Sequence, residues 1–542
     1  MNFHTFNPFG YEGQLCTVEV DTRRGIPAVD IVGIADSSVT ESRMKIKAAI
    51  QNSGLQFPPE RVLISISPAD IRKEGAANDF AIALATLAAR EENPDYSDNN
   101  FKYPDEHVLV LGELDLSGQI RPVRGVHAAV TTAYAAGIKN IICSPAMEKE
   151  VKASLNGDQK INLLVTDNLG DCVNKMKSMD SFVYYEPNLD KERSPSDPLN
   201  IQFPEKDPEI NIDEKFLGKH KNTVRAIEIA VAGKHNLLLV SGPGYGKTLL
   251  TQSLVPVITP KLTEEESMSV KRIYSLAGLV SPDKVSTELN APYRMPHPTA
   301  SIEGICGGGT NCRPGEISLA HNGVLILDEA AEFRTSVLQM LRVPLENGSI
   351  ILSRAGRTTV FPAHFQLIMT SNPSSDGNYM VPGKVSLDSK ESLNRYWNKF
   401  GNPLLDRVAV QSFVYPDEKS KETVSVESLK KNIANAYKIQ RKNGAYNQHL
   451  SPVELKERIS DSFTPEMNDY FAKSQKKYDF TPRRIAETMK VALTIANLDN
   501  REKIQMKDLK EAINFTKSWK EQAIDLNKKI NREKEKSEGR ER

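Results

Sequence analysis

A stretch of small residues between two apolar runs has the composition of a phosphate-binding loop. An apolar run at residues 237–240 leads into it, and a helix-compatible run follows at 249–254. In such a loop, backbone N–H groups and a helix N-terminus face an anion, a lysine reaches the outer phosphates, and a hydroxyl is a ligand for Mg²⁺. Ser241 stands where the pattern G-x-x-x-x-G-K-[ST] has its first glycine. The candidate nucleotide-binding residues are Gly242, Pro243, Gly244, Tyr245, Gly246, Lys247 and Thr248.

Two carboxylates follow a second apolar run and could complete the site that this loop begins. Residues 324–327 are apolar, and Asp328 and Glu329 follow them directly. Asp328 suits a contact to Mg²⁺, and Glu329 suits the orientation of a water molecule against a terminal phosphate. We therefore predict that ATP and Mg²⁺ bind here, with Thr248 and Asp328 as the metal ligands.

Three more polar residues stand where they could act on the same phosphates. Asn372 ends an apolar run and can hold the attacking water, although by itself it would be read as an Asn-Pro turn residue. Arg407 follows a short helix and can reach the nucleotide of a neighbouring subunit, whereas alone it would be read as a surface salt-bridge residue. Arg483 opens a later helix, from which it can touch the same phosphates. The predicted catalytic residues are Glu329, Asp328, Asn372, Arg407 and Arg483.

Residues 350–361 read as a hairpin with a basic, glycine-containing turn. Arg354 and Arg357 flank that turn and are candidates for following a nucleic-acid backbone. An ordinary solvated turn is an equally good interpretation.

The elements that must position these residues follow an N-terminal α+β unit. Its strands are predicted at 14–22, 29–34 and 62–66, its helices at 41–53 and 79–88, and its last strand at 141–143. Segments 73–79 and 112–125 resemble the proteolytic domain of Lon-type peptidases, which has a ribosomal S5 domain 2-like fold. In that pattern the nucleophilic serine falls at Ala77 and the activating lysine at Ala129. Alanine can do neither task, so the chain is not a peptidase.

Composition and charge limit the possible partners, the cellular location and the domain division. Lys+Arg and Asp+Glu are equal at 70 each, so a contact to nucleic acid must come from local patches. Five scattered cysteines indicate a reducing compartment, and neither a signal peptide nor a membrane-spanning run is found, so we expect a cytoplasmic protein. The predicted domains are a Lon-like domain at 1–175, a linker at 176–212, an ATPase core at 213–415, a helical lid at 416–518 and a charged, solvated tail at 519–542.

Several longer motifs resemble one family over residues 5–518. GGGTNCRPGEISLAHNGVLILDEAAEF, YRMPHPTAS, RIYSLAGLV and PLLDR are similar to the ComM (YifB) group of magnesium-chelatase-like AAA+ ATPases. The resemblance implies an α/β fold with a P-loop AAA+ core and helical lid, a ring that is usually hexameric, and a DNA helicase that promotes branch migration during natural transformation. It further implies that Asn372 is sensor 1, Arg407 an arginine finger acting in trans and Arg483 sensor 2. The group has cysteines after sensor 1, where this chain reads Ser374-Ser375-Asp376-Gly377.

Three functions remain open from the sequence. The first is an ATP-driven motor acting on single-stranded or branched DNA. The second is a chelatase-type motor acting on a protein partner, against which the fused N-terminal domain argues. The third is an ATP switch without motor activity, whose N-terminal domain binds a protein.

Overall fold

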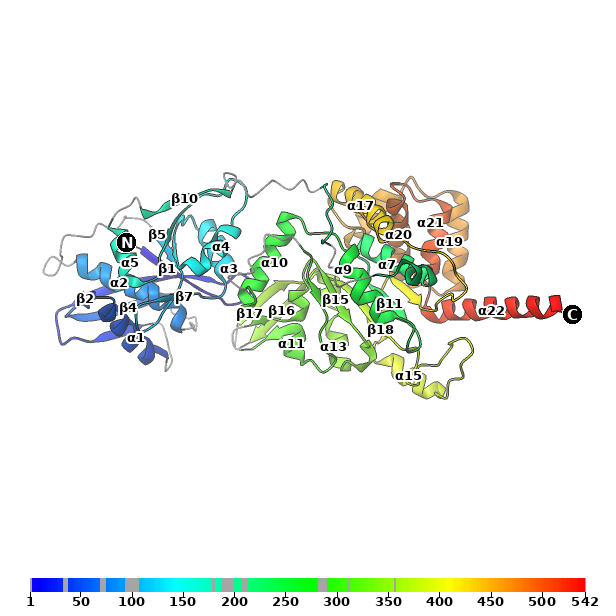
Figure 1. Ribbon diagram of the computed structural model, residues 1–542, viewed down its shortest axis with the longest axis horizontal. Helices are drawn as coiled ribbons and strands as arrows, with labels where there is room; N and C mark the ends of the chain where they lie inside the picture. The colour runs from blue at the N-terminus through cyan, green and yellow to red at the C-terminus, as the bar shows by residue number, and fades with distance from the viewer. Residues whose placement is uncertain are drawn as a thin grey trace.

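The computed structural model describes residues 2–32, 38–68, 75–92, 107–177, 181–187, 199–205, 212–280, 290–309, 312–354 and 357–541. Three units follow one another along the molecule: an N-terminal α+β unit, a central unit built on a parallel sheet, and a group of C-terminal helices (Figure 1). Residues 178–180, 188–198 and 206–211 of the predicted linker lie outside the described residues, as does the turn 355–356.

The N-terminal unit is built on an eight-stranded sheet in the order β10-β9-β8-β5-β1-β2-β4-β3. The predicted strands and helices of this unit are confirmed within a few residues. The strands are β1 (Asn2–Asn7), β2 (Gln14–Arg23), β3 (Val29–Val32), β4 (Arg61–Ser67), β5 (His107–Val110), β8 (Asn140–Cys143), β9 (Ile161–Val165) and β10 (Val183–Tyr185), with a separate β6 (Glu113–Leu114) and β7 (Ile120–Arg121) pair. The helices are α1 (Ser38–Asn52), η1 (Gly75–Asn78), α2 (Asp79–Glu92), α3 (Val126–Ala135), α4 (Pro145–Ala153) and α5 (Leu169–Met176).

The prediction that 141–143 is the last strand of this unit is wrong. β9 pairs with β8 in parallel, and β10 pairs with β9 in the antiparallel direction, so the sheet continues into the segment predicted as a linker. β10 has only three residues, and Val183 and Tyr184 are exposed, so neither length nor alternation marks it as a strand.

The central sheet has five parallel strands in the order β12-β15-β18-β11-β19. They are β11 (Leu237–Val240), β12 (Tyr293–Arg294), β15 (Val324–Leu327), β18 (Gln366–Ser371) and β19 (Val410–Phe413). The four longer strands are buried throughout, and β11 and β15 accordingly appear in the sequence as continuous apolar runs rather than as alternation, whereas β18 and β19 also bury polar side chains. Since the strands are parallel, the residues that follow β11, β15 and β18 meet at one edge of the sheet.

Short helices and hairpins surround that sheet. The helices are α6 (Glu214–Lys219), α7 (Lys221–Gly233), α8 (Lys247–Leu249), η4 (Leu250–Leu254), α9 (Val255–Ile258), α10 (Glu264–Ala277), α11 (Ile302–Cys306), α12 (Glu316–Leu319), η6 (Ala330–Glu332), α13 (Thr335–Met340), α14 (Pro344–Asn347), α15 (Lys390–Asn398) and α16 (Asn402–Leu405). The hairpins are β13 (Gly307–Gly308) with β14 (Arg313–Pro314), and β16 (Ser349–Arg354) with β17 (Arg357–Pro362). The second one confirms the predicted hairpin.

The C-terminal helices share a core with the central unit. Ile433, Val491 and Leu509 belong to the same buried cluster as Ile227 of α7 and Leu237 of β11. These helices are α17 (Val426–Lys442), η7 (Asn447–His449), α18 (Pro452–Ile459), α19 (Pro465–Lys477), α20 (Pro482–Leu498), α21 (Met506–Thr516) and α22 (Trp519–Glu541). Among the residues described, no helix has both the length and the apolar character needed to cross a membrane.

The prediction of a solvated tail at 519–542 is wrong for its first turns. Helix α22 projects from the end of the molecule (Figure 1), yet Trp519 and Ala523 at its start are buried. The Trp519 ring lies 4.9 Å from the ring of Trp397, measured between centroids, and stacks on Phe413 of β19. Two apolar residues one turn apart are enough to fix a helix start inside a sequence dominated by Lys and Glu.

Candidate nucleotide-binding site

The loop after β11 turns sharply into a helix. Gly244 and Gly246 have φ angles of 85° and 76°, which favour glycine, and a Cβ at Gly246 would lie 2.7 Å from the ring of Phe216. The helix starts as α8 and then takes a π-helical turn, η4, before continuing as α9. Pro256 in α9 has no N–H to donate to the carbonyl four residues earlier, which accounts for the irregular turn.

The ammonium group of Lys247 is enclosed by oxygen atoms. Its Nζ donates to the Ser241 carbonyl at 2.7 Å, to the Ser241 hydroxyl at 3.0 Å and to Asn372 Oδ1 at 3.0 Å. Burial lowers the pKa of Lys247 to about 8, although Asp328 and Glu329 act in the opposite direction. The P-loop lysine and the predicted Asn therefore lie together, as the sequence led us to expect.

The carboxylate of Asp328 connects three elements at the same edge. Thr248 Oγ1 lies 3.3 Å from Asp328 Oδ2, and Thr370 Oγ1 donates to Asp328 Oδ1 at 2.5 Å. The backbone N–H of Glu329 donates to Thr370 Oγ1 at 2.9 Å, while the Glu329 side chain is exposed. Sequence reasoning missed Thr370; the available signal was a hydroxyl directly after the apolar residues 367–369, two residues before Asn372.

The polar groups at this edge suit the binding of a nucleotide together with Mg²⁺. A hydroxyl and a carboxylate, from Thr248 and Asp328, are hard oxygen ligands of the kind that Mg²⁺ prefers. The lysine ammonium is surrounded by uncharged acceptors, so an anion can replace them as its partner. Gly244 has open space where a Cβ would stand, which lets a phosphate approach the backbone closely.

The two arginines predicted to act on the phosphates, Arg407 and Arg483, do not lie at the edge that carries Lys247. Val410 at the start of β19 pairs with Leu237 at the start of β11, so Arg407 lies at the amino ends of the strands, opposite the P-loop. The Asn236 side chain donates to the Arg407 carbonyl at 2.8 Å, which confirms that placement. Arg407 therefore stands away from the Lys247 of its own chain.

Arg407 and Arg483 share one carboxylate. Arg407 Nη2 and Arg483 Nη1 both pair with Glu346 of α14, the latter at 3.3 Å. Hydrogen bonding from Arg407 is the largest cause that lowers the pKa of Glu346, so this carboxylate stays ionised. The neighbouring Arg484 is buried and donates to the Leu405 and Val408 carbonyls at 2.9 and 2.7 Å, which ties α20 to the loop carrying Arg407. The sequence indicated neither Glu346 nor Arg484.

Arg354 and Arg357 are paired across the end of the hairpin, as Cα partners in the β16–β17 register. The structure describes their backbone and not their side chains. The hairpin begins directly after α14, so the carboxylate of Glu346 stands at its base.

The residues that replace the Lon serine and lysine lie in the N-terminal unit. Ala77 belongs to η1, and Ala129 is fully buried in α3. Neither side chain carries a nucleophile or base, so this unit has no Ser/Lys dyad at these positions.

Three family descriptions match consecutive parts of the chain. Residues 18–147 match "Subunit ChlI of Mg-chelatase", residues 214–423 match "Magnesium chelatase, subunit ChlI", and residues 423–516 match "Magnesium chelatase, subunit ChlI C-terminal". The matches cover the N-terminal, central and C-terminal units in turn.

Similarity to individual proteins extends over nearly the whole chain. The uncharacterized protein YifB of Escherichia coli K12 is 34% identical over 519 residues, which are 94% of this chain and 96% of that protein. The competence protein ComM of Haemophilus influenzae is 31% identical over 523 residues, 93% of this chain and 95% of that protein. A short similarity, 31% over 98 residues, relates 18% of this chain to 9% of the archaeal Lon protease of Pyrococcus abyssi.

Proposed function

The chain belongs to the ComM/YifB family of magnesium-chelatase-like AAA+ ATPases, and on that premise we propose that it is a ring-forming motor that hydrolyses ATP to act on DNA. The observation that carries the proposal is the division of the site between two edges of one sheet. Lys247 and Asp328 lie at one edge and Arg407 at the other. Two copies of the chain side by side would bring the edges together, and repetition of that contact closes a ring, as in the hexamers usual for the family.

The P-loop edge would bind ATP and position water. Lys247 exchanges the Asn372 and Ser241 oxygens for the outer phosphates, and Asn372 Oδ1 is then free to accept a hydrogen bond from the attacking water. Bound Mg²⁺ would neutralise phosphate charge, with Thr248 and Asp328 as its ligands. Glu329 is exposed beside them and takes the proton from water.

The opposite edge would serve the neighbouring subunit. Arg407 and Arg483 lie together on Glu346, so both guanidinium groups can reach one phosphate chain bound to the next copy. An arginine supplied in this way stabilises the charge that develops during phosphoryl transfer. ATP turnover would then require assembly.

The hairpin β16–β17 is the proposed contact to DNA. Arg354 and Arg357, which are Cα partners at its end, supply two positive charges, and a ring would repeat that charge around a central opening. The similarity to a competence protein supports a role in recombination during natural transformation, such as branch migration.

A chelatase-type motor that acts on a protein partner is the second candidate. The match of residues 214–423 to a magnesium chelatase subunit favours it. Such a motor needs no nucleic acid, so its ATP turnover would not change when DNA is added.

The test is ATP turnover with branched DNA, with single-stranded DNA and without nucleic acid. We expect DNA to stimulate turnover, and the double variant Arg354→Ala/Arg357→Ala to lose stimulation together with salt-sensitive DNA binding. Lys442→Ala/Lys456→Ala removes the same charge from exposed positions on the C-terminal helices and is the matched control. Turnover that is indifferent to DNA in the unmodified protein would refute the DNA motor and favour the chelatase type.

A further inference from the structure

The loop of residues 8–13, which joins β1 to β2, lies against the candidate DNA hairpin. The Tyr11 N–H donates to Thr359 Oγ1 of β17 at 3.2 Å, and the Tyr11 ring meets the Phe361 ring edge-on with centroids 6.0 Å apart. Gly10 has a φ of +65°, and a Cβ there would lie 2.0 Å from Thr359 Oγ1. Only glycine allows this close approach of the loop backbone to β17.

Arg272 of α10 holds the same loop from its other side. Its guanidinium donates to the Tyr11 and Glu12 carbonyls, both at 2.9 Å, and to Thr131 Oγ1 of α3 at 2.9 Å. It also lies 4.9 Å from the centroid of the Tyr11 ring. The Arg272 side chain is 12% exposed, and bonds from a shielded cation to carbonyls are stronger than neutral ones. The loop backbone is thereby fixed where it meets the hairpin.

The end of α10 adds a second, independent contact with the N-terminal unit. Gly125 N–H donates to the Ser275 carbonyl at 3.0 Å, and the Ser275 hydroxyl donates to Glu150 at 2.6 Å. Leu276 is buried in a cluster that also includes Val126 of α3. The boundary between the two units is therefore packed as an interior and not as a loose contact.

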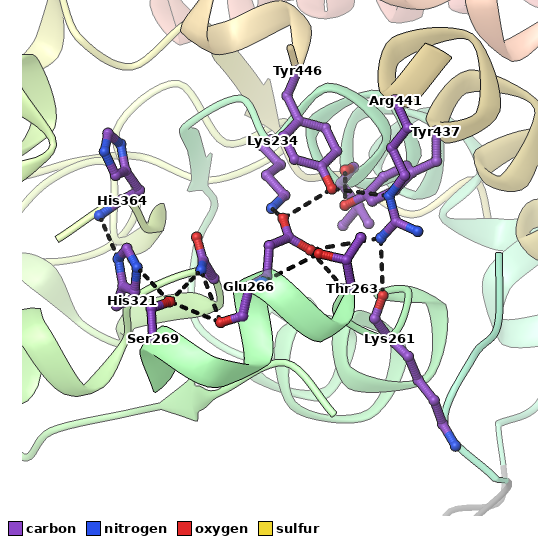
Figure 2. A network of polar contacts seen from close by, with 12 residues as sticks. Lys234, Lys261, Thr263, Glu266, Ser269, His321, His364, Tyr437, Arg441 and Tyr446 are labelled. Carbon is purple, nitrogen blue, oxygen red and sulfur yellow. Dashed lines mark hydrogen bonds and ion pairs between the residues drawn. The ribbon is translucent and has the colours of Figure 1, made fainter. Parts of the chain in front are cut away.

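The beginning of α10 is fixed to the rest of the molecule (Figure 2). Glu266 Oε1 lies 3.1 Å from Lys234 Nζ and accepts from the Tyr446 hydroxyl at 3.0 Å. Arg441 of α17 lies 3.7 Å from the other oxygen of this carboxylate. Lys234 directly follows α7, which leads into β11 and the P-loop, while Tyr446 and Arg441 come from the C-terminal part. One helix thus connects the nucleotide-binding unit, the C-terminal helices and the N-terminal loop.

The hairpin needs support of this kind. A two-stranded ribbon is marginally stable by itself. Ile350, Leu352 and Phe361 face the core, whereas Ile351 and Val360 on the other side are exposed. Figure 1 shows β16 and β17 at the side of the central unit that faces the N-terminal unit, near α10. The loop 8–13 contacts the β17 strand of this hairpin.

We propose that the loop 8–13 braces the hairpin β16–β17, and that Tyr11 and Arg272 are the positioning residues of this brace. The N-terminal unit is then a fixed part of the motor and holds the hairpin in position when force acts on it. It is not a tethered module that recruits a partner. What the hairpin contacts rests on the proposed function; the brace itself does not.

Four variants of the full-length protein test the brace. Tyr11→Ala removes the ring that packs on Phe361, whereas Tyr11→Phe keeps the ring and the backbone donor and should behave as the unmodified protein. Arg272→Gln removes the charge that holds the loop carbonyls. Arg395→Gln, at an exposed site on α15, is the matched control.

Hydrogen exchange of the backbone amides at 358–361 is the first readout. Loss of one such contact should speed exchange about tenfold in Tyr11→Ala and Arg272→Gln, while amides of β11 and α20 keep their protection, which shows that the fold persists. The second readout is turnover, where DNA stimulation should fall several-fold while turnover without DNA and ATP affinity stay unchanged.

The outcomes separate the two proposals. If the hairpin loosens as expected but DNA never stimulates the unmodified protein, the DNA function fails and the brace stands. If exchange at 358–361 stays at the unmodified rate in both Tyr11→Ala and Arg272→Gln, the brace is overturned, whether or not DNA stimulates turnover. A Tyr11→Phe variant as loose as Tyr11→Ala would overturn the role given to the Tyr11 ring.

Discussion

The ammonium group of Lys247 donates a hydrogen bond to the side-chain oxygen of Asn372, 3.0 Å away, and so joins the P-loop to the tip of β18. The other oxygens that Lys247 contacts are also uncharged. Burial among such partners lowers the pKa of Lys247 to about 8. A phosphate chain replaces neutral oxygens with negative ones, which raises that pKa.

Nucleotide binding should therefore take up a proton at alkaline pH. Since the free protein has Lys247 with a pKa of about 8 and the complex has a higher one, ATP affinity is nearly constant below pH 8. Above it, affinity falls by up to about tenfold per pH unit. Calorimetric titration at pH 8.5 in two buffers of different ionisation enthalpy measures the uptake. Lys247→Arg, which does not titrate in this range, should abolish it; proton release by the unmodified protein would contradict the assignment.

Ser241 adds a side-chain hydroxyl to this P-loop, which a glycine at this position would not provide. Its hydroxyl lies 3.0 Å from Lys247 Nζ and donates to the Gly242 carbonyl at 2.9 Å. The hydroxyl competes with phosphate for the ammonium, so Ser241→Ala should bind ATP about three- to tenfold more tightly, the value of one such hydrogen bond. Fluorescent-nucleotide titration measures the change, and Ser371→Ala, at a neighbouring buried hydroxyl that does not contact Lys247, is the control. Weaker binding by Ser241→Ala would show that the hydroxyl supports the phosphate contact instead.

Glu329 should be needed for turnover and not for binding. Its side chain is exposed beside Asp328, and its backbone is held by Thr370, so the carboxylate can reach water without being a ligand of the loop. Glu329→Gln keeps the shape and loses the base, so hydrolysis should fall by about 10²- to 10⁴-fold. ATP affinity should remain within a factor of about three, because no contact to Lys247 is lost. Glu332→Gln is the control, since Glu332 is an exposed carboxylate three residues later. Persistent turnover in Glu329→Gln would show that another group is the general base.

The P-loop edge could be predicted because its signals are local. β11 and β15 are buried throughout and appear as apolar runs, β18 has an apolar centre at 367–369, and the polar residues Asp328 and Asn372 follow the ends of β15 and β18. Parallel pairing then brings those ends together.

Contacts across the fold could not be predicted in this way. Glu346 meets Arg483 across 137 residues, and Tyr11 meets Thr359 across 348, so only the packing of whole units makes them neighbours. Trp519 was missed for a related reason, because one apolar turn among charged residues has no periodicity.

Glu346 provides the last prediction, because it holds two cations that have no other carboxylate partner among the contacts described. Without its charge, the guanidinium groups of Arg407 and Arg483 repel each other and lose a common orientation. The carboxylate is 52% exposed, so solvent screening reduces the effect. We take it as about 1 kcal/mol, which lowers kcat about fivefold in Glu346→Gln.

The KM for ATP should not change in this variant, since the two arginines are proposed to stabilise the charge that develops during phosphoryl transfer rather than to hold ATP in the ground state. Glu418→Gln breaks an exposed ion pair with Lys219 and is the matched control. Steady-state turnover of the assembled protein separates the two parameters. If Glu346→Gln turned over faster, the carboxylate would restrain the arginines rather than position them. If its KM rose with kcat unchanged, the arginines would act on ATP binding, and their proposed role in the chemistry of the neighbouring subunit would be wrong.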